Sequence, residues 1–402
     1  MSLLTPAQAE SLIEQHLVCL PIESLPLTQV AGAVLRENIY AERDQPPFNR
    51  VAMDGVALAS HAAAAGRRSF RIQATQAAGD PPLSLGAAQE CIEVMTGAVL
   101  PGGCDCVVPL EELTVTAGDA LLSRDARTEV WRNVHRRGSD SRQGTLLLAA
   151  GVKLRAPEVA IAASAGMARI RVSSQPMLAV ISTGNELVEP GEPVLPHQIR
   201  RSNAYAVVSA LREHGFQRVA DDHIHDDADE LRERLKFHLD THDVLVLSGG
   251  VSTGRFDLVP KVLEELGVRT VFHTVAQRPG KPLWFGMSAS GTAAFGLPGN
   301  PVSTLVCFTR YVLPALLGSL GHNAAPTERI ALGAPVSVTA PLTHFLPVRL
   351  EQDDWGRAWA IPAPTNGSGD VTGLAGTDGF VELPPGPNTY PKGHVSRFYR
   401  WS

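Results

Sequence analysis

The sequence predicts a multidomain protein that combines a doubly wound, mostly parallel α/β domain with β-rich domains. Residues 176–320 alternate aliphatic, strand-like runs with helix-like segments. Residues 25–175 and 322–402 instead contain short β-like runs separated by glycine, proline and asparagine. Because 402 residues exceed what one hydrophobic core usually organises, we expect two to four domains.

The predicted α/β domain opens with two strand–helix units. PMLAVIST is the first strand, and the helix after it has Ser202 as its expected N-cap and Gly215 as its expected C-cap. RVADDHIHD is the second strand. In the helix that follows, Leu231, Leu235 and Leu239 share one face, which we expect to be buried.

The third strand, DVLVLSGG, is a continuous aliphatic run, which is typical of a strand buried on both faces of a parallel sheet. The pattern continues with the helix LVPKVLEELG and the strands VRTVFHTVA, LWFGMS and AAFGLPG. A long helix then begins at Pro301, where proline suits the first turn. This alternation predicts helices on both faces of one sheet.

The flanking segments indicate β structure. Five runs before residue 125 have strand-like composition: SFRIQAT, CIEVMTGAVL, DCVVPLEE, LTVTAG and ALLS. The segment 322–402 is rich in proline and has no helical period, so we expect a small terminal β barrel or sandwich there.

Composition and charge narrow the class of protein. Hydrophobic residues are 44% and charged residues 19%, as in ordinary globular proteins. The N-terminal stretch indicates an amphipathic helix and not a signal sequence, so we expect a cytoplasmic protein without a membrane partner. A net charge of −6 argues against nucleic-acid binding but leaves room for a local basic pocket. The five cysteines indicate reduced thiols, and Cys104 and Cys106 are expected to be buried small side chains and not metal ligands.

Three loops of the α/β domain follow aliphatic strands and mix glycine with hydroxyl or amide side chains. They are STGNEL, SGGVSTG and GLPGNP. Each could simply close a tight turn, but three at the carboxyl edge of one sheet favour a phosphate site. None matches a P-loop, and no dinucleotide fingerprint follows the first strand. The predicted substrate-binding residues here are Ser248, Gly249, Gly250, Ser252, Thr253, Gly254, Pro298, Gly299, Asn300 and Pro301.

Three acids accompany these loops: Glu186, Asp226 and Asp257. Carboxylates would repel a phosphate unless a divalent cation lay between them, so the pattern predicts Mg²⁺ held by these three residues. Helix capping is the alternative for Asp226 and Asp257, because each precedes a helix. Arg278 and Lys281 flank a Pro-Gly turn and are candidate substrate contacts, although a solvated lysine beside a turn is equally ordinary.

Eight stretches together resemble the molybdopterin molybdenumtransferase family, the molybdenum-insertion enzymes related to the C-terminal region of gephyrin. The resemblance covers nearly the whole chain. The stretches are RVAMDGVA, VMTGAVLPGGCDCVVPLEE, NVHRRGSD, AVISTGNEL, IRRSNAYAV, SGGVSTGRFD, RPGKPLWFG and GLPGNPVSTLVCF.

The resemblance implies four domains and an elongated homodimer. The domains are a discontinuous linker domain of residues 22–43 and 142–172, a β-rich domain of 44–141, a molybdopterin-binding α/β domain of 1–21 and 173–321, and a C-terminal β barrel of 322–402. The active cleft of such a dimer lies between the α/β domain of one subunit and the β domain of the other.

The implied activity is insertion of molybdenum from molybdate into adenylylated molybdopterin, with Mg²⁺-dependent release of AMP. Further implied partners are the molybdopterin adenylyltransferase and molybdoenzyme chaperones. Two alternatives stay open: an adenylyltransferase that prepares the substrate, which the flanking β domains disfavour, and a gephyrin-like scaffold, which the acids around the loops disfavour.

The resemblance also assigns catalytic roles to six positions: Asp54, Thr96, Asp140, Glu186, Asp226 and Asp257. Lys281 occupies the second basic position of the family's K-P-G-K-P, and Arg278 replaces its first lysine. Three departures could tune the oxyanion site, because Thr274, Val56 and Arg201 stand where the family usually has a lysine, a tyrosine and an acid.

Overall fold

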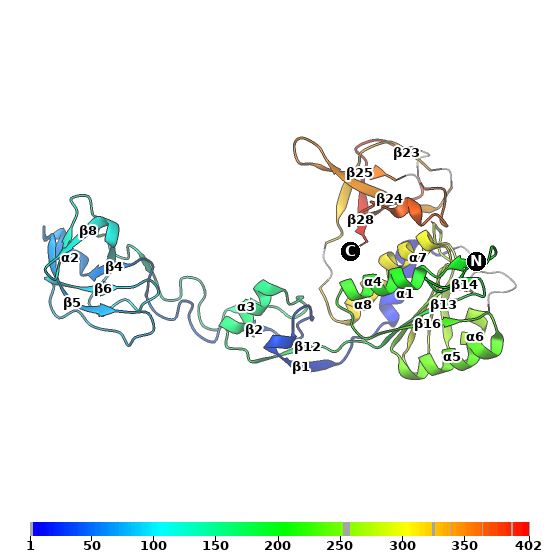
Figure 1. Ribbon diagram of the computed structural model, residues 1–402, viewed down its shortest axis with the longest axis horizontal. Coiled ribbons are helices and arrows are strands. Elements are labelled where there is room, and N and C mark those ends of the chain that lie inside the picture. Colours follow the sequence, from blue (N-terminus) through cyan, green and yellow to red (C-terminus); the bar gives the residue numbers. More distant parts are fainter. Residues whose placement is uncertain are drawn as a thin grey trace. The chain divides into compact units, whose positions relative to one another are not determined.

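The computed structural model describes residues 3–251, 258–323, 326–338, 340–363, 365–386 and 389–401. The chain forms two compact units (Figure 1). The large unit comprises Met1–Arg36, Gly151–Arg155 and Arg169–Ser402, and the small unit comprises Glu37–Ala150 and Ala156–Ala168. The finer division into four domains stays a prediction.

The large unit contains the predicted α/β sheet. Its six strands run in the order β16-β13-β17-β21-β20-β18. The first four are parallel, and β20 is antiparallel to both of its neighbours. Because the chain moves outward from β13 to β16 and then crosses to β17, the winding reverses between β13 and β17. The strands are β13 (Leu178–Thr183), β16 (Val219–Ile224), β17 (Val244–Ser248), β18 (Arg269–His273), β20 (Trp284–Met287) and β21 (Ala293–Leu297).

Helices cover both faces of this sheet, as predicted (Figure 1). Alternate residues of β13 enter different cores, because side chains of a strand point to opposite faces. Leu178 and Val180 pack with α1, α4, α7 and α8, whereas Ala179 and Ile181 pack with α5 and α6. The helices are α1 (Pro6–His16), α4 (Asn203–Glu213), α5 (Ala228–Thr241), α6 (Val259–Glu265), α7 (Pro301–Cys307) and α8 (Leu313–Ser319), with a π-helical segment, Phe308–Val312, joining the last two.

Helix ends differ from two sequence expectations. Ser202 precedes α4, but its side chain makes no capping hydrogen bond. Asp227, and not Asp226, caps α5: its Oδ1 accepts hydrogen bonds from the backbone N–H groups of Asp229 (3.0 Å) and Glu230 (2.9 Å). The N-cap of α5 is therefore Asp227, and the capping alternative for Asp226 is wrong.

The C-terminal part of the large unit is a closed five-stranded barrel, which confirms the barrel over the sandwich. The pairing order is β24-β25-β22-β28-β26, and β26 pairs back with β24. The short strand β19 (Gln277–Arg278) joins β24 in parallel and ties the QRPGKP stretch to the barrel. The barrel strands are β22 (Arg329–Leu332), β24 (Thr343–Gln352), β25 (Ala358–Pro362), β26 (Gly379–Leu383) and β28 (Val395–Arg400).

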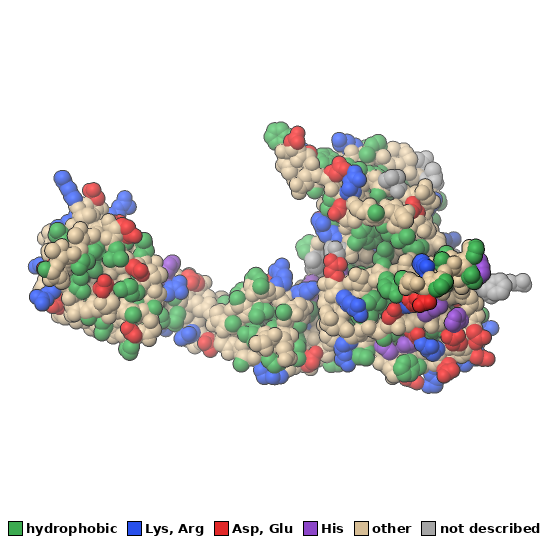
Figure 2. Space-filling model, viewed as in Figure 1, with side chains coloured by type: hydrophobic (Ala, Val, Ile, Leu, Met, Phe, Trp, Pro, Cys, Tyr) green, Lys and Arg blue, Asp and Glu red, His purple; other side chains and the backbone are tan. Residues whose placement is uncertain are grey.

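The β24–β25 hairpin displays a tryptophan. Trp355 is 86% exposed in its turn, and Figure 2 shows hydrophobic atoms beside acidic ones at the tip. Asp353 orders the turn by accepting hydrogen bonds from Trp359 Nε1 (3.0 Å), Arg357 N (2.9 Å) and Trp355 N (3.0 Å). These hydrogen bonds, that of Trp359 first, lower the pKa of Asp353, so the turn is held by a carboxylate and not by burial.

The small unit is built on a six-stranded sheet of order β7-β4-β6-β5-β9-β8. Five of these strands coincide with the five predicted runs, and the sixth, β4, begins at the glycine of the M-D-G motif. They are β4 (Gly55–Leu58), β5 (Ser69–Gln76), β6 (Glu90–Val94), β7 (Cys106–Pro109), β8 (Leu113–Thr116) and β9 (Asp119–Leu122).

Shorter elements complete the chain. In the small unit they are β2 (Ile39–Tyr40), β3 (Arg50–Val51), α2 (Ser60–Ala64), η2 (Leu110–Glu112), β10 (Val134–His135), β11 (Leu146–Leu148) and α3 (Ala156–Ser164). In the large unit they are β1 (Ile22–Pro26), η1 (Leu27–Gln29), β12 (Arg169–Ser173), β14 (Leu187–Val188), β15 (Ile199–Arg200), β23 (Val336–Ser337), η4 (Thr372–Leu374) and β27 (Thr389–Tyr390).

Two sequence features acquire a structural context. Cys104 and Cys106 are buried, and burial raises the pKa of each thiol to about 12, which agrees with small core side chains and disfavours thiolate ligands. The continuous helix Pro301–Ser319 is long and apolar enough to cross a membrane, but 72% of its apolar 18-residue window is buried inside the protein, as in the core helix of a globular domain.

We predict that Asp227→Ala lowers the free energy of unfolding by about 1 kcal/mol, because α5 loses its N-cap. Glu233→Ala, which removes an exposed acid from the middle of the same helix, should cost clearly less. Urea denaturation followed by circular dichroism measures both. Equal losses for the two variants would contradict the assignment of the cap to Asp227.

Candidate active site

A cavity of about 530 Å³ opens at the carboxyl ends of β13, β17 and β21, where the winding of the sheet reverses. We call it the strand-end pocket. Ligands of open α/β sheets bind at this position. The pocket lies within the large unit, and six predicted residues line it: Glu186, Ser248, Gly249, Gly299, Asn300 and Pro301.

The turn after β17 requires glycine. Gly249 and Gly250 have φ angles of +94° and +61°, in the left-handed region that glycine adopts without strain. A Cβ on Gly249 would lie 2.5 Å from the carbonyl oxygen of Thr183. The two strand ends therefore approach closely only because this side chain is missing, and Gly249 lines the pocket while Gly250 lies one residue farther along the same turn.

The GLPGNP loop is held from two sides. Asn203 Nδ2, at the start of α4, donates a hydrogen bond to Gly299 O (2.7 Å). Asn300 Nδ2 donates to Ser368 Oγ (2.8 Å) in the segment that follows β25, so the asparagine does not cap α7. Pro298 O accepts a hydrogen bond from Thr304 Oγ1 (2.6 Å). These contacts fix the loop between the sheet and the barrel.

The predicted acids occupy the loops around this edge. Glu186 is exposed and lines the pocket, and Gly184 makes room for its carboxylate, because a Cβ there would lie 2.6 Å from Glu186 Oε2. Asp226 is also exposed, and its backbone N–H donates to Asn185 Oδ1 (3.1 Å), which joins the end of β16 to the same loop. Asp226 is not among the residues that line the pocket.

Part of the predicted site lies outside the described residues: Ser252, Thr253, Gly254 and Asp257. Within the described ranges, no group of three or more His, Cys, Asp or Glu side chains could hold a metal ion. Because Asp257 is the third expected ligand, the Mg²⁺ site stays a prediction.

Arg201 is a buried cation in the wall of the pocket. Its side chain is 5% exposed, and its guanidinium pairs with the carboxylates of Glu189 and Asp221. Its Nε also donates to Ser182 Oγ (3.2 Å). Hydrogen bonds from Arg201 and then from Tyr205 lower the pKa of Glu189. Two acids thus neutralise Arg201, which anchors the loop after β14 to the neighbouring strand β16.

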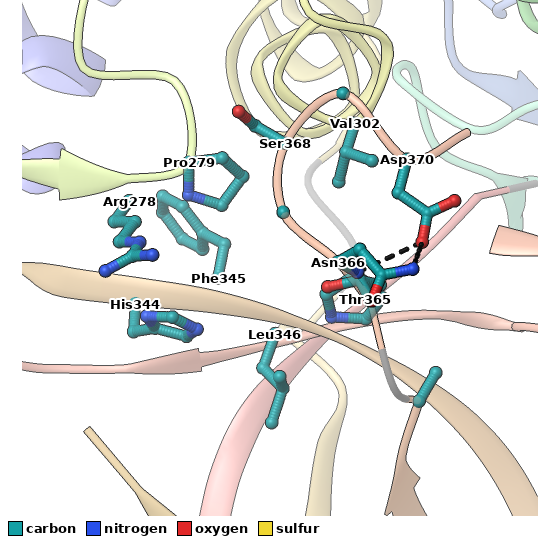
Figure 3. Close-up of a pocket in the computed structure, with 14 residues that line it drawn as sticks. Arg278, Pro279, Val302, His344, Phe345, Leu346, Thr365, Asn366, Ser368 and Asp370 are labelled. Atoms are coloured by element: carbon teal, nitrogen blue, oxygen red, sulfur yellow. Dashed lines mark hydrogen bonds between the residues drawn. The ribbon is translucent and has the colours of Figure 1, made fainter. Parts of the chain in front are cut away.

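Arg278 does not join the strand-end pocket. It lines a second cavity of about 1060 Å³, between β19 and the barrel (Figure 3). Figure 3 shows Arg278 beside His344 on one side of this cavity, and Asn366 and Asp370 on the other side. Burial, and then the charge of Arg278, lowers the pKa of His344, which favours its neutral form. Lys281 is exposed and lines neither cavity.

The remaining predicted residues, Asp54, Thr96 and Asp140, lie in the small unit. Asp54 Oδ1 accepts hydrogen bonds from both Thr96 Oγ1 and Thr96 N, each 2.6 Å long. These two bonds lower the pKa of Asp54. Asp140 is exposed and accepts a hydrogen bond from Ser139 Oγ (3.1 Å). Their approach to the large-unit residues across a dimer stays a prediction.

Two other departures from the family pattern have local consequences. Val56 is buried in β4, within the core of the small unit. Thr274 has a φ angle of +81°, which is strained for a β-branched residue, and its N–H donates to Leu283 O (2.9 Å).

Sequence reasoning missed several lining residues, including Thr183, Arg200 and Asn203. A signal existed for Thr183, which directly follows Ser182 in the first glycine-containing loop. Arg200 and Asn203 lie in the stretch IRRSNAYAV, but their residue types gave no signal of their own, because a helix start and the residues before it are normally polar.

We predict that Thr96→Val raises the pKa of Asp54, because the hydroxyl donor is lost while the backbone donor stays. The stabilisation from this carboxylate is present above its ordinary pKa of 3.8 and is lost as pH falls through its lower folded pKa. NMR titration of the Asp54 carboxyl carbon measures the change. Thr75→Val, which removes a hydroxyl that donates to Glu93, is the control and should leave Asp54 unchanged.

Three family models match consecutive parts of the chain. They are described as "MoeA N-terminal region (domain I and II)" for residues 4–166, "Probable molybdopterin binding domain" for 179–318, and "MoeA C-terminal region (domain IV)" for 329–401. The middle model spans the sheet and the helices that form the strand-end pocket.

Relatives agree over the full length. A protein of Synechocystis sp. named molybdopterin molybdenumtransferase is 40% identical over 99% of this chain and 100% of its own length. A Bacillus subtilis protein of the same name is 31% identical, over 90% of this chain and 85% of its own. The crystal structure of the molybdopterin biosynthesis MoeA protein from Pyrococcus horikosii has a TM-score of 0.82 and 31% identity, with complete coverage of both chains. The chain therefore belongs to the molybdopterin molybdenumtransferase family, a family of transferases.

Proposed function

We propose that this chain inserts molybdenum from molybdate into adenylylated molybdopterin and releases AMP in a Mg²⁺-dependent step. The observation that carries the proposal is the strand-end pocket, where three glycine-containing loops meet beside the carboxylate of Glu186. The names of the relatives support the substrates, because each is called a molybdopterin molybdenumtransferase.

The phosphates of the substrate would bind at the turn that follows β17. Ser248 offers a hydroxyl at the pocket wall, and Gly249 beside it adds no Cβ, although its own N–H is taken by Leu297 O (3.3 Å). The predicted continuation of the turn, Ser252 to Gly254, and Lys281 would complete this contact. Hydrogen bonds from a pre-formed turn stabilise phosphate charge without reorganisation, which is how such sites promote reaction.

The acids at this edge have the chemistry that Mg²⁺ requires. Glu186 and Asp226 are both exposed acids, and oxygen ligands are what this hard cation prefers. With Asp257 they would hold the ion next to the phosphates. When bound, Mg²⁺ would neutralise phosphate charge and polarise the phosphoanhydride. The link from Asp226 N to Asn185 Oδ1 keeps two of these acids on connected loops.

Molybdate would enter through the second cavity. Arg278 supplies a cation there, and the neutral His344 does not compete with it for the oxyanion. The hydrogen bond between Asn300, which lines the strand-end pocket, and Ser368, which lines the second cavity, connects the two walls. Arg278 and the Ser368 hydroxyl would orient the oxyanion beside the bound substrate.

Three further elements belong to the proposal. Asp54, Thr96 and Asp140 would come from the second subunit of a homodimer and close the cleft. The protein would act in the cytoplasm. The molybdopterin adenylyltransferase and molybdoenzyme chaperones would be its partners before and after the reaction.

The deciding experiment measures AMP release from adenylyl-molybdopterin, with molybdate or tungstate, and with or without Mg²⁺. We expect AMP release only when an oxyanion and Mg²⁺ are both present. Consumption of ATP with molybdopterin and without molybdate would instead identify an adenylyltransferase, and no turnover with any of these substrates would favour a scaffold.

We predict that Glu186→Gln lowers the rate of AMP release by about 10²- to 10³-fold, the range for loss of one charge-stabilising group, and raises the Mg²⁺ concentration needed for half-maximal rate. Glu192→Gln, which changes an exposed acid in the following loop, is the matched control and should keep both values. An unchanged Mg²⁺ requirement in Glu186→Gln would remove Glu186 from the metal role.

A further inference from the structure

Gln277 is a buried amide whose polar atoms are all paired. It lies in β19, directly before Arg278, and is completely buried. Its Nε2 donates hydrogen bonds to Pro279 O (3.3 Å) and Gly280 O (3.1 Å), and its Oε1 accepts one from Tyr311 OH. A buried amide is costly unless its donors and acceptors are paired, and a fully paired one fixes the groups around it in one arrangement.

The surroundings of this amide allow only one orientation. If it were reversed, Gln277 Oε1 would face Pro279 O and Gly280 O, so that acceptors would meet acceptors. Burial raises the pKa of Tyr311, which keeps its hydroxyl protonated and able to donate to Oε1. The two carbonyl groups of the turn and the tyrosine hydroxyl therefore select the same orientation.

The turn after β19 is also packed against the helix that begins at Pro301. Gly280 has a φ angle of +89°, and a Cβ there would lie 2.5 Å from Cys307 Sγ and 2.8 Å from Gln277 Nε2. The Cys307 thiol donates to Gly280 O (3.7 Å), and burial raises its pKa, so it stays protonated. The backbone of the turn is thus held by the amide on one side and by the helix on the other.

Tyr311 reaches the amide from the π-helical segment Phe308–Val312. Such segments insert one residue into a helix and often occur at functional sites. Tyr311 is 2% exposed, and its hydroxyl donates to an amide that is itself buried. Stability alone does not explain these polar groups, because an apolar pair of the same shape can replace a buried hydrogen bond at little cost.

Arg278 projects from the other side of β19. Neighbouring residues of a strand point in opposite directions, so Gln277 faces the interior while Arg278 is exposed. Arg278 and Pro279 line the second cavity on the same side (Figure 3). Among the residues that the structure describes, none forms a hydrogen bond or an ion pair with the Arg278 side chain. The direction of this guanidinium therefore depends on the backbone that carries it.

We propose that Gln277 and Tyr311 are positioning residues. Their hydrogen bond holds the turn at Pro279 and Gly280 so that Arg278 points into the second cavity, where its guanidinium binds a small oxyanion. The identity of that oxyanion as molybdate rests on the proposed function, whereas the positioning role rests on the buried hydrogen bonds.

Tyr311→Phe tests the proposal, because it removes one hydroxyl and keeps the ring. The probe is sodium molybdate, titrated calorimetrically into the full chain. Its affinity should fall by about three- to tenfold, the size of one net hydrogen bond between neutral groups. Gln277→Met keeps the length of the side chain and removes the amide, so it should cause a loss of similar size.

A double-mutant cycle with Arg278→Ala separates positioning from a general loss of structure. Arg278→Ala alone should weaken molybdate binding more than Tyr311→Phe does, because it removes the guanidinium itself. Adding Tyr311→Phe to Arg278→Ala should cause no further loss, since the hydroxyl acts through Arg278. An effect of Tyr311 that is merely structural would instead add to that of Arg278→Ala.

Tyr390→Phe is the matched control. Tyr390 is 2% exposed in the core of the barrel, and its hydroxyl donates to Pro384 O. Its replacement also removes a buried tyrosine hydroxyl from a backbone or amide oxygen, so it should lower the melting temperature. The affinity for molybdate should stay at the wild-type value.

The outcomes separate the positioning role from the proposed function. Wild-type molybdate affinity in Tyr311→Phe, a further loss in the double variant, or no molybdate binding by the wild-type chain would each overturn the positioning role. If molybdate binding depends on Tyr311 and Arg278 but the wild-type protein releases no AMP from adenylyl-molybdopterin, the positioning role holds and the proposed function fails. If Tyr311→Phe releases AMP with the wild-type dependence on molybdate concentration, the function holds and the positioning role fails.

Discussion

The parallel ladder of β13, β17 and β21 is the constraint on which the site depends. Its register places Ser182 opposite Ser248, and Ser248 opposite Leu297, so three loops start at one level. The three strands are buried on both faces, so the points at which the loops leave the sheet are held in fixed positions. Close approach of the loops then requires glycine at 249, where any side chain would meet the backbone of β13.

Electrostatics at this edge follows from which charges are already paired. The buried guanidinium of Arg201 forms ion pairs with Glu189 and Asp221. Glu186 stays exposed at the pocket, and the hydrogen bonds of Arg200 to described residues go to carbonyl oxygens. Among the described residues that line the pocket, one acid and one cation are thus left for ligands, beside a helix start without a side-chain cap. Such a surface suits a phosphate that arrives with a divalent cation better than a neutral ligand.

Residue patterns within single segments predicted the fold, because each helix and strand is determined mainly by the spacing of its own apolar residues. The continuous aliphatic run of β17 and the helical spacing of the leucines in α5 were enough to predict that these residues are buried. The same reasoning named Arg278 as a substrate contact, but it could not predict that this side chain lines a second cavity and not the strand-end pocket. The reason is the pairing of β19 with β24, a contact between segments more than sixty residues apart that leaves no local trace. Ser202 is likewise a residue type that favours the N-cap position, but its side chain makes no hydrogen bond to the backbone of α4.

Arg201 shows why a departure from a family pattern needs its three-dimensional partners before it is interpreted. As a sequence position, an arginine in place of an acid suggests a more positive oxyanion site. In the structure its guanidinium is buried between Glu189 and Asp221, and burial of so large a cation is tolerable only with such pairing. The substitution therefore changes how the loop after β14 is fastened to β16, and adds no free charge to the pocket. The adjacent Arg200, which no family comparison singled out, is the residue that does.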